Sequence, residues 1–186
     1  MSSTRHVAIV GAGFGGLGVA EQLGHVPVEV TLIDRHNYHT FQPLLYQVAT
    51  SLLNAEDVGA PVRSLFRHQD NVTFHMATVT GIDAAGQNIQ LDDGKQISYD
   101  YLVLAGGATV NYFNTPGAAE HAFPLYTLTN AVKLRNRILE RFEAADRNPA
   151  LIEDGALNFV IVGAGPTGVE TAGALSDLFY NLLPRD

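Results

Sequence analysis

Cysteine is absent from the 186 residues of this chain. Its absence excludes a disulfide framework, a thiolate metal site and a redox-active cysteine pair within the sequence. Basic residues are also few, since 11 Lys and Arg stand against 19 Asp and Glu and give a formal net charge of -8. Because they form no cluster, the sequence argues against binding to the phosphate backbone of a nucleic acid.

Long apolar runs are missing as well. No stretch approaches the roughly 18 consecutive apolar residues of a membrane-spanning helix, and glycines interrupt the N-terminal apolar stretch where a secretory signal would need continuity. We therefore expect a soluble, cytoplasmic chain. Glycine is abundant, with 18 residues, and 46% of the chain is hydrophobic. This composition is typical of a glycine-rich α/β protein with one sizeable core.

A glycine-rich segment, GAGFGG, occupies residues 11–16 and is called the first glycine loop below. It follows an apolar, strand-like run at residues 6–10 and precedes a helical pattern from about Phe14 to Gly24. A second β-branched run, VEVTLID, follows at residues 28–34. Strand, glycine turn, helix and second strand in this order predict a Rossmann-type dinucleotide site.

Each glycine of the first loop has its own expected role. Gly11 permits the tight strand-to-helix turn, Gly13 lets a pyrophosphate approach the backbone, and Gly16 lets the helix pack closely on its strand. Phe14 and Gly15 begin the helix, whose dipole and unpaired N–H groups favour an anion. We therefore expect these five residues to bind the cofactor.

Asp34 ends the second strand and is expected to accept hydrogen bonds from the ribose hydroxyls of an adenosine. Its charge would repel a 2′-phosphate, so the first site favours FAD or NAD over NADP. Arg35 follows directly, and its guanidinium either stacks on the adenine or is solvated. His36 and His39 lack a third ligand at a fitting spacing, so we expect surface or hydrogen-bonding histidines and no metal site.

The middle of the chain changes its periodicity twice. Residues 36–68 predict two short helices, with Pro43 and Pro61 as helix starts or breaks. Residues 72–105 alternate with period two and predict a β-meander, followed by a buried strand that runs into two glycines. Residues 127–147 carry an apolar stripe at helical spacing and predict a long helix capped by Thr127 or Thr129.

A second glycine loop, GAGPTG, occupies residues 163–168 after an apolar run at 158–162 that predicts another strand. Gly163, Gly165 and Gly168 repeat the phosphate-binding pattern, and Pro166 with Thr167 suits the first helical turn. Proteins that carry two dinucleotide clefts chiefly pass electrons between two dinucleotides. The sequence therefore predicts a dinucleotide-dependent oxidoreductase.

Four segments together resemble the type II NADH:quinone oxidoreductases, which belong to the two-dinucleotide-binding-domain flavoproteins. They are GAGFGGL, NYHTFQPLLYQVAT, DYLVLAGGATVNYF and VGAGPTGVETAGAL. The resemblance implies an α/β chain with a Rossmann-like FAD-binding domain at residues 1–110. Residues 111–186 would then hold a connector, a long helix and the first β-α unit of a Rossmann-like NAD(P)-binding domain.

The resemblance also implies further site residues. Gln42 and Pro43 lie in the segment expected to pass the flavin ring. Val79 matches a strand position whose backbone pairs with adenine. The turn formed by Ala105, Gly106 and Gly107 is expected beside the cofactor, although the superfamily commonly has Ala-Thr-Gly there. Glu170 either positions the nicotinamide and assists proton delivery to quinone, or is an ordinary acid stabilised by its helix dipole.

FAD and NAD(H) are the implied cofactors, and NADH and quinone the implied substrates. The intact enzyme is expected as a peripheral protein, and as a homodimer, on the cytoplasmic face of the inner membrane. Family members are more than twice this length, so we expect an N-terminal portion that is inactive alone. Two alternatives stay open: another NAD(P)H-dependent flavoprotein reductase, and an inert dinucleotide-binding remnant.

Overall fold

The computed structural model describes residues 4–183 and shows an α/β chain with two compact units. The first unit comprises Met1–His39 and Ala60–Ala108, and the second comprises Thr40–Gly59 and Thr109–Asp186. The bounds expected from the sequence, 1–110 and 111–186, place residues 40–59 in the first domain. Their apolar side chains instead pack with Ala131 in the second unit.

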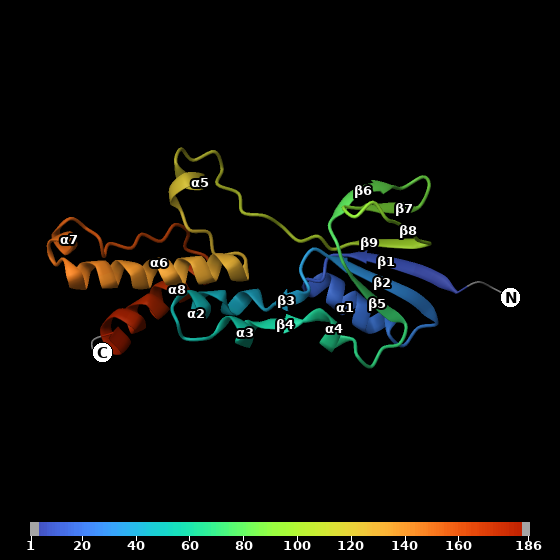
Figure 1. The fold of residues 1–186 in the computed structure, drawn as a ribbon, viewed down its shortest axis with the longest axis horizontal. Coiled ribbons are helices and arrows are strands. Elements are labelled where there is room, and N and C mark those ends of the chain that lie inside the picture. The colour runs from blue at the N-terminus through green and yellow to red at the C-terminus, as the bar shows by residue number, and fades with distance from the viewer. Residues whose placement is uncertain (1–3, 184–186) are drawn as a thin grey trace. The chain divides into compact units, whose positions relative to one another are not determined.

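A four-stranded parallel sheet forms the centre of the first unit (Figure 1). Its strands, in spatial order, are β5 (Val72–Met76), β2 (Val28–Asp34), β1 (Arg5–Val10) and β9 (Tyr101–Leu104). The first glycine loop leads from β1 into helix α1 (Phe14–Leu23), which ends at Gly24. The predicted strand–turn–helix–strand unit is therefore confirmed.

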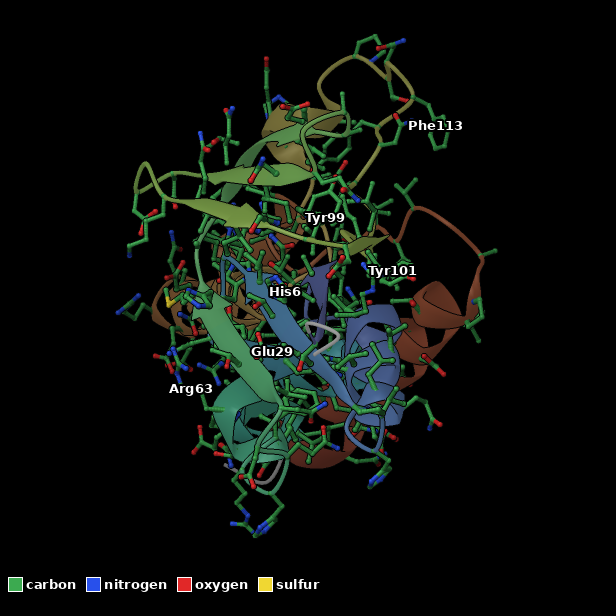
Figure 2. All side chains as sticks on the ribbon, turned by 90° about the vertical axis from the view of Figure 1, so that its right-hand side faces the viewer. His6, Glu29, Arg63, Tyr99, Tyr101 and Phe113 are labelled. Atoms are coloured by element: carbon green, nitrogen blue, oxygen red, sulfur yellow. The ribbon has the colours of Figure 1, made fainter. Side chains whose placement is uncertain are left out.

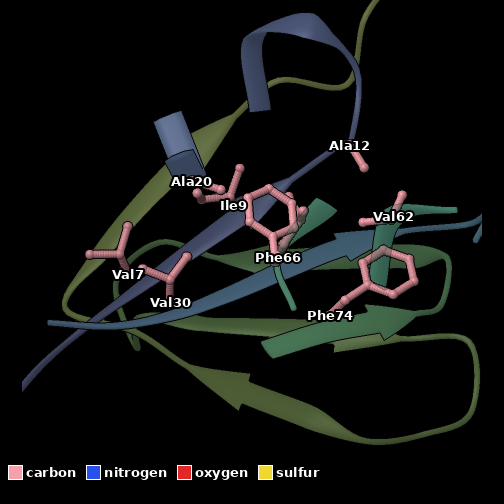
Figure 3. Packing of buried hydrophobic residues seen from close by; sticks show 9 residues of the cluster. Val7, Ile9, Ala12, Ala20, Val30, Val62, Phe66 and Phe74 are labelled. Carbon is pink, nitrogen blue, oxygen red and sulfur yellow. The ribbon is translucent and has the colours of Figure 1, made fainter. Parts of the chain in front are cut away.

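Helix α1 packs on one face of this sheet. Its Ala20 meets Ile9 and Leu32 from the two central strands, and these three residues are fully buried. Phe66 and Phe74 complete the same cluster (Figure 3). Full burial of a large apolar side chain is worth about 1.5–3 kcal/mol. Because Ala12 of the glycine loop belongs to this cluster, the packing of α1 on the sheet helps to hold the loop at the end of β1.

A small antiparallel meander belongs to the same unit: β6 (Val79–Asp83), β7 (Asn88–Leu91) and β8 (Gln96–Ser98). Its Ile89 and Leu91 pack against Ala8 and Ile33 of the parallel sheet. The ring of His6 (Figure 2) also connects the two sheets, because Nδ1 donates to the carbonyl oxygen of Ser98 at 2.6 Å and Nε2 lies 2.8 Å from the Thr31 hydroxyl.

Two strand predictions need correction. Residues 72–76 were expected in the meander, but β5 pairs in parallel with β2, because the chain breaks its extended run after Met76. Strand β9 was expected to be buried, yet Tyr101 and Leu104 are 60% and 66% exposed. The reason is position: β9 is an edge strand of the described sheet, paired with β1 alone.

The second unit is built around helix α6 (Leu128–Arg147). Thr127 is its N-cap, since the Thr127 hydroxyl accepts from the backbone N–H of Asn130 at 3.1 Å. Ala131 and Ile138 of the predicted apolar stripe are buried. Of the two threonines that the sequence offered as caps, the structure therefore selects Thr127.

Short elements make up most of the remaining described chain. They are β3 (Tyr38–Thr40), the 3-10 helix η1 (Gln42–Leu44), α2 (Leu45–Ala49), α3 (Ala55–Val58), β4 (Gly59–Pro61), α4 (Val62–Leu65), α5 (Ala118–His121), α7 (Ala150–Glu153), α8 (Pro166–Asp177) and the π-helix η2 (Leu178–Leu182). Residues 36–68 thus hold more than the two short helices predicted for them. Strands β3 and β4 pair with each other, and the boundaries of the two units at residues 39–40 and 59–60 fall within them.

The strand expected at residues 158–162 does not form. Val160 and Val162 are 86% and 94% exposed, whereas Phe159 packs against the rings of Phe142 and Phe179. A parallel strand needs neighbours for its backbone groups, and residues 4–183 provide none here. In the same described range, no helix is long and apolar enough to cross a membrane.

Candidate functional site

The backbone of the first glycine loop requires its glycines. Gly11 has a φ of +104°, and a Cβ there would overlap the carbonyl oxygen of Ala105. A Cβ at Gly16 would overlap the carbonyl oxygen of Gly11. A Cβ at Gly13, in contrast, would meet no atom within 4 Å. Gly13 therefore faces open space, as an approaching phosphate requires.

Helix α1 begins directly at this open position. Gly13 is its N-cap, with an extended backbone at φ -78° and ψ -171°, and Phe14 is its first residue. The first N–H groups of a helix have no partner inside the helix and lie at the positive end of its dipole. Gly15 lies close to Ala105, because its Cβ would stand 3.7 Å from the Ala105 Cβ. The first glycine loop is thus a candidate anion site.

Asp34 holds this loop from the neighbouring strand. One carboxylate oxygen accepts from the Ala12 N–H at 2.7 Å, and the other accepts from the His36 N–H at 2.8 Å. A carboxylate offers about four acceptor positions, so about two stay available for ribose hydroxyls. The side chain of Arg35 is exposed beside it. Asp34 is therefore both an anchor of the loop and a candidate ribose acceptor.

The turn after β9 reaches the same loop. The Ala105 N–H donates to the Val10 carbonyl at 2.8 Å, which carries the parallel pairing to the start of the glycine turn. Gly106 is exposed, and a Cβ added there would meet no atom within 4 Å. Gly107 turns the chain with a φ of +72°. The structure brings Ala105 and Gly106 next to the first glycine loop, and their expected contact with a cofactor stays a prediction.

Val79 lies near the Asp34 end of this site. The Ala77 N–H donates to the Asp34 carbonyl at 2.9 Å, and Val79 begins β6 two residues later. Strand β6 is at the edge of the meander, paired on one side with β7. A backbone edge near Asp34 suits an adenine contact, which for Val79 stays a prediction.

Gln42 and Pro43 lie in the second unit and are not part of the site built within the first. Both side chains are exposed, and the Gln42 amide donates to the Tyr126 carbonyl at 3.3 Å. Pro43 lies inside the 3-10 helix η1. Their expected contact with a flavin ring stays a prediction.

The second glycine loop repeats the backbone geometry of the first. Gly163 has a φ of +108°, and a Cβ at Gly168 would overlap the Gly163 carbonyl oxygen. Gly165 is the N-cap of α8, with nothing within 4 Å of an added Cβ, and Pro166 is the first helical residue. The turn thus forms without a flanking strand, because its glycines favour it locally.

Thr167 and Glu170 lie in the exposed first turns of α8. The Thr167 carbonyl accepts from the Thr171 hydroxyl at 2.6 Å. The side chain of Glu170 is exposed, and the described contacts give it no partner that would decide between its two expected roles.

His39 is the site residue whose contact the sequence did not specify. Its Nδ1 lies 3.1 Å from the Ala12 carbonyl oxygen, and its ring meets Phe14 edge-on with centroids 4.9 Å apart. The expectation of a hydrogen-bonding histidine is consistent with this geometry. The specific partner had no sequence signal, because residues 12 and 39 meet only when β1, β2 and β3 are assembled.

Comparisons with known proteins assign the chain to a family. The family model described as pyridine nucleotide-disulphide oxidoreductase matches residues 5–182. The type II NADH:quinone oxidoreductase Ndh of Mycobacterium tuberculosis (strain ATCC 25618 / H37Rv) is 43% identical over 184 residues, covering 96% of this chain and 40% of its own length. The external alternative NAD(P)H-ubiquinone oxidoreductase B1 of Solanum tuberosum mitochondria is 33% identical, covering 99% of this chain and 34% of its own.

A solved structure shows the same fold. NDH2 from Plasmodium falciparum in complex with NADH superposes with a TM-score of 0.83 at 24% identity, over 97% of this chain and 38% of that one. The chain thus spans about 40% of the length of the curated relatives it matches. These matches confirm the resemblance drawn from the four segments, and the chain belongs to the pyridine nucleotide-disulphide oxidoreductase family.

Proposed function

We propose that this chain supplies the FAD site and the start of the NAD(H) site of a type II NADH:quinone oxidoreductase. The observation that carries the proposal is the pair of glycine loops. Both loops have the same backbone geometry, although they lie about 150 residues apart in the chain. The similar M. tuberculosis and S. tuberosum proteins are named for oxidation of NADH or NAD(P)H with a quinone.

FAD is assigned to the first loop and not to the second. Asp34 can accept the adenosine ribose there, and Gly13 leaves space for the pyrophosphate. The segment FQPLLYQVA resembles the flavin segment of the family, which favours FAD over NAD at this loop. When bound, the flavin would supply the hydride-accepting and electron-passing chemistry, while Asp34 and the loop amides bind and orient it.

NADH is assigned to the second loop, where Gly165 is open and Pro166 begins the helix. The P. falciparum protein of the same fold was solved with NADH. In this arrangement Glu170 would order the nicotinamide or relay a proton to quinone. From the resemblance we also propose that the whole enzyme is a homodimer bound to the cytoplasmic face of the inner membrane, with the membrane contact made outside this chain.

Reconstitution tests the FAD assignment. The purified 186-residue chain is incubated with excess FAD, passed through a desalting column and examined for flavin absorption. Retained flavin, displaced by ADP but not by adenosine 2′,5′-bisphosphate, is the expected result, because Asp34 would repel the 2′-phosphate. A chain that is folded by circular dichroism and retains no flavin would contradict the assignment and favour an inert remnant. Displacement of the flavin by adenosine 2′,5′-bisphosphate in preference to ADP would favour a different reductase.

A further inference from the structure

Both backbone groups of Ala12, inside the first glycine loop, take part in hydrogen bonds to side chains. Its N–H donates to Asp34 Oδ2 at 2.7 Å, and its carbonyl oxygen lies 3.1 Å from His39 Nδ1. Ala12 is 3% exposed, so water does not replace these partners. Because a carbonyl oxygen can only accept, His39 Nδ1 must carry the proton of this bond. The contact therefore fixes the tautomer of the neutral ring as Nδ1–H.

The ring of His39 is also held by packing. Its centroid lies 4.9 Å from that of Phe14, with the two planes at 85°, an edge-to-face contact. Phe14 is the first residue of α1, and Gly13 before it is the N-cap. His39 thus contacts the residues on both sides of Gly13.

The Ala12 carbonyl and the Gly13 N–H belong to one peptide group. A hydrogen bond to the carbonyl fixes the plane of that group and strengthens its N–H as a donor. Gly13 is also the position with no atom within 4 Å of an added Cβ. The polarised amide therefore lies at the place that is open to a ligand.

The second glycine loop shows that this contact is not needed to form the turn. Gly163 has the same left-handed backbone as Gly11, with φ +108° against +104°. Ala164, which matches Ala12, is exposed, and no side chain of residues 4–183 bonds to its peptide groups. The bond from His39 is therefore not required for the shape of the turn, and its effect falls on the orientation and polarity of the Ala12–Gly13 peptide group.

We propose that His39 is a positioning residue for the pyrophosphate of the dinucleotide in the first loop, acting through the Ala12–Gly13 peptide in the Nδ1–H tautomer. This inference rests on the proposed dinucleotide site. It assigns His39 no direct contact with the ligand. Its effect should therefore depend on whether the ligand carries a pyrophosphate.

Two variants separate positioning from mere packing. His39→Leu removes the donor, whereas His39→Asn keeps an N–H near the place of Nδ1. We expect His39→Leu to weaken FAD and ADP by about three- to tenfold, the size of one hydrogen bond, and to leave adenosine within about twofold. His39→Asn should restore most of the loss. His75→Leu, at an exposed position on β5, is the matched control and should change neither affinity.

Measurements without ligand give a second test on the full 186-residue chain. ¹⁵N NMR should show His39 in the Nδ1–H form. The Gly13 amide should exchange its hydrogen more slowly in His39→Leu than in wild type, because loss of the bond to the Ala12 carbonyl makes the N–H of that peptide group less acidic. An Nε2–H tautomer, equal losses for adenosine and ADP, or a folded His39→Asn that rescues nothing would overturn the inference. If the wild-type chain binds neither FAD nor ADP, the proposed function is wrong. The tautomer of His39 and the exchange rate of the Gly13 amide then still test whether His39 acts on the Ala12–Gly13 peptide group.

Discussion

The carboxylate of Asp34 accepts two backbone hydrogen bonds and is also a candidate acceptor for a ligand. Its oxygens accept from the N–H groups of Ala12 and His36, and they retain acceptor positions toward the loop. The carboxylate thereby ties β2 to the glycine loop that precedes α1. A ligand that bonds to Asp34 meets a group whose orientation is already set.

Replacing Asp34 with Ala should lower the affinity for FAD by about ten- to over a hundredfold, since one hydrogen-bonding charged group is worth roughly 1.5–3 kcal/mol. Flavin fluorescence titration measures the change, and Asp93→Ala, on the exposed turn of the meander, serves as the control. An unchanged dissociation constant for Asp34→Ala would remove Asp34 from the site.

Asp100 predicts a dependence of stability on pH. The His6 backbone N–H, and then the Arg5 guanidinium, hold the pKa of the Asp100 carboxyl below its ordinary value of 3.8. Because the folded pKa is lowered, the stabilisation is complete above the unfolded value and is lost as the pH falls from there through the folded pKa. Asp100→Asn should therefore be less stable than wild type near neutral pH, with a difference that shrinks below about pH 4.

Urea midpoints measured between about pH 6 and pH 3 check this prediction. Asp70→Asn, a change at an exposed loop carboxylate, is measured beside it as the control for removing one charge. A difference between wild type and Asp100→Asn that stays constant over the whole pH range would mean that ionisation of Asp100 does not contribute.

Glu170 lies on the exposed surface of α8, and its role depends on the longer protein proposed above. If its carboxylate orders the nicotinamide or relays a proton, Glu170→Gln in that protein should slow flavin reduction or quinone turnover by about ten- to a hundredfold. The FAD content should not change. Stopped-flow measurement of both half-reactions decides the role, since wild-type rates in each would leave Glu170 as a partner of the helix dipole.

At the scale of elements, the two glycine loops share one turn but differ in support. The first is held between β1, β2 and β9, with Ala105 beside Gly11. The second connects the irregular run at residues 158–162 to α8. The glycines alone therefore shape the turn, while the sheet around the first loop fixes where the turn points.

Three Gly→Ala changes in one loop and helix should have three different effects. Gly16→Ala puts a methyl group onto the Gly11 carbonyl and should destabilise the fold by about 1–3 kcal/mol or more. Gly13→Ala meets no protein atom, so it should keep the fold and lose FAD. Gly18→Ala, in mid-helix with open space around it, should stabilise by about 0.5–1 kcal/mol.

Thermal unfolding measures the stability of the three variants, and FAD titration measures their affinity for the flavin. A Gly13→Ala protein that binds FAD like wild type would show that the phosphate does not approach the backbone there. Equal stability of Gly16→Ala and Gly18→Ala would contradict the close contact between α1 and the turn.

At the scale of the whole molecule, the chain carries one glycine loop supported by a sheet and, within residues 4–183, a second glycine loop without such support. It spans about 40% of the length of the relatives whose names state NADH:quinone activity. Hydride transfer needs a complete nicotinamide cleft next to the flavin, and quinone reduction needs access for the quinone.

We therefore expect the 186-residue chain to show no sustained NADH oxidation with a soluble quinone, even when it retains FAD. The measurement follows NADH absorbance with the reconstituted chain, whose mass is verified, beside a buffer containing free FAD. Turnover above the free-FAD background would contradict the expectation and place a complete active site within these residues.

Local patterns in the sequence determined the first β-α-β unit, both glycine turns and helix α6. Strand β2 ends at Asp34 as the β-branched run predicts, and α1 ends where Gly24 interrupts its pattern. These features depend on periodicity, capping and the backbone freedom of glycine, all of which act between residues close in sequence. The candidate dinucleotide site was predicted from the same local patterns.

The tertiary structure decided the features that depend on neighbours distant in sequence. Strand β5 joins the parallel sheet because β2 offers it an edge, and the run at residues 158–162 stays irregular because the described chain offers it none. The bond between His39 and Ala12 likewise exists only once three strands are assembled. Strand pairing and long-range hydrogen bonds need both partners in place, and one segment read by itself contains only one of them.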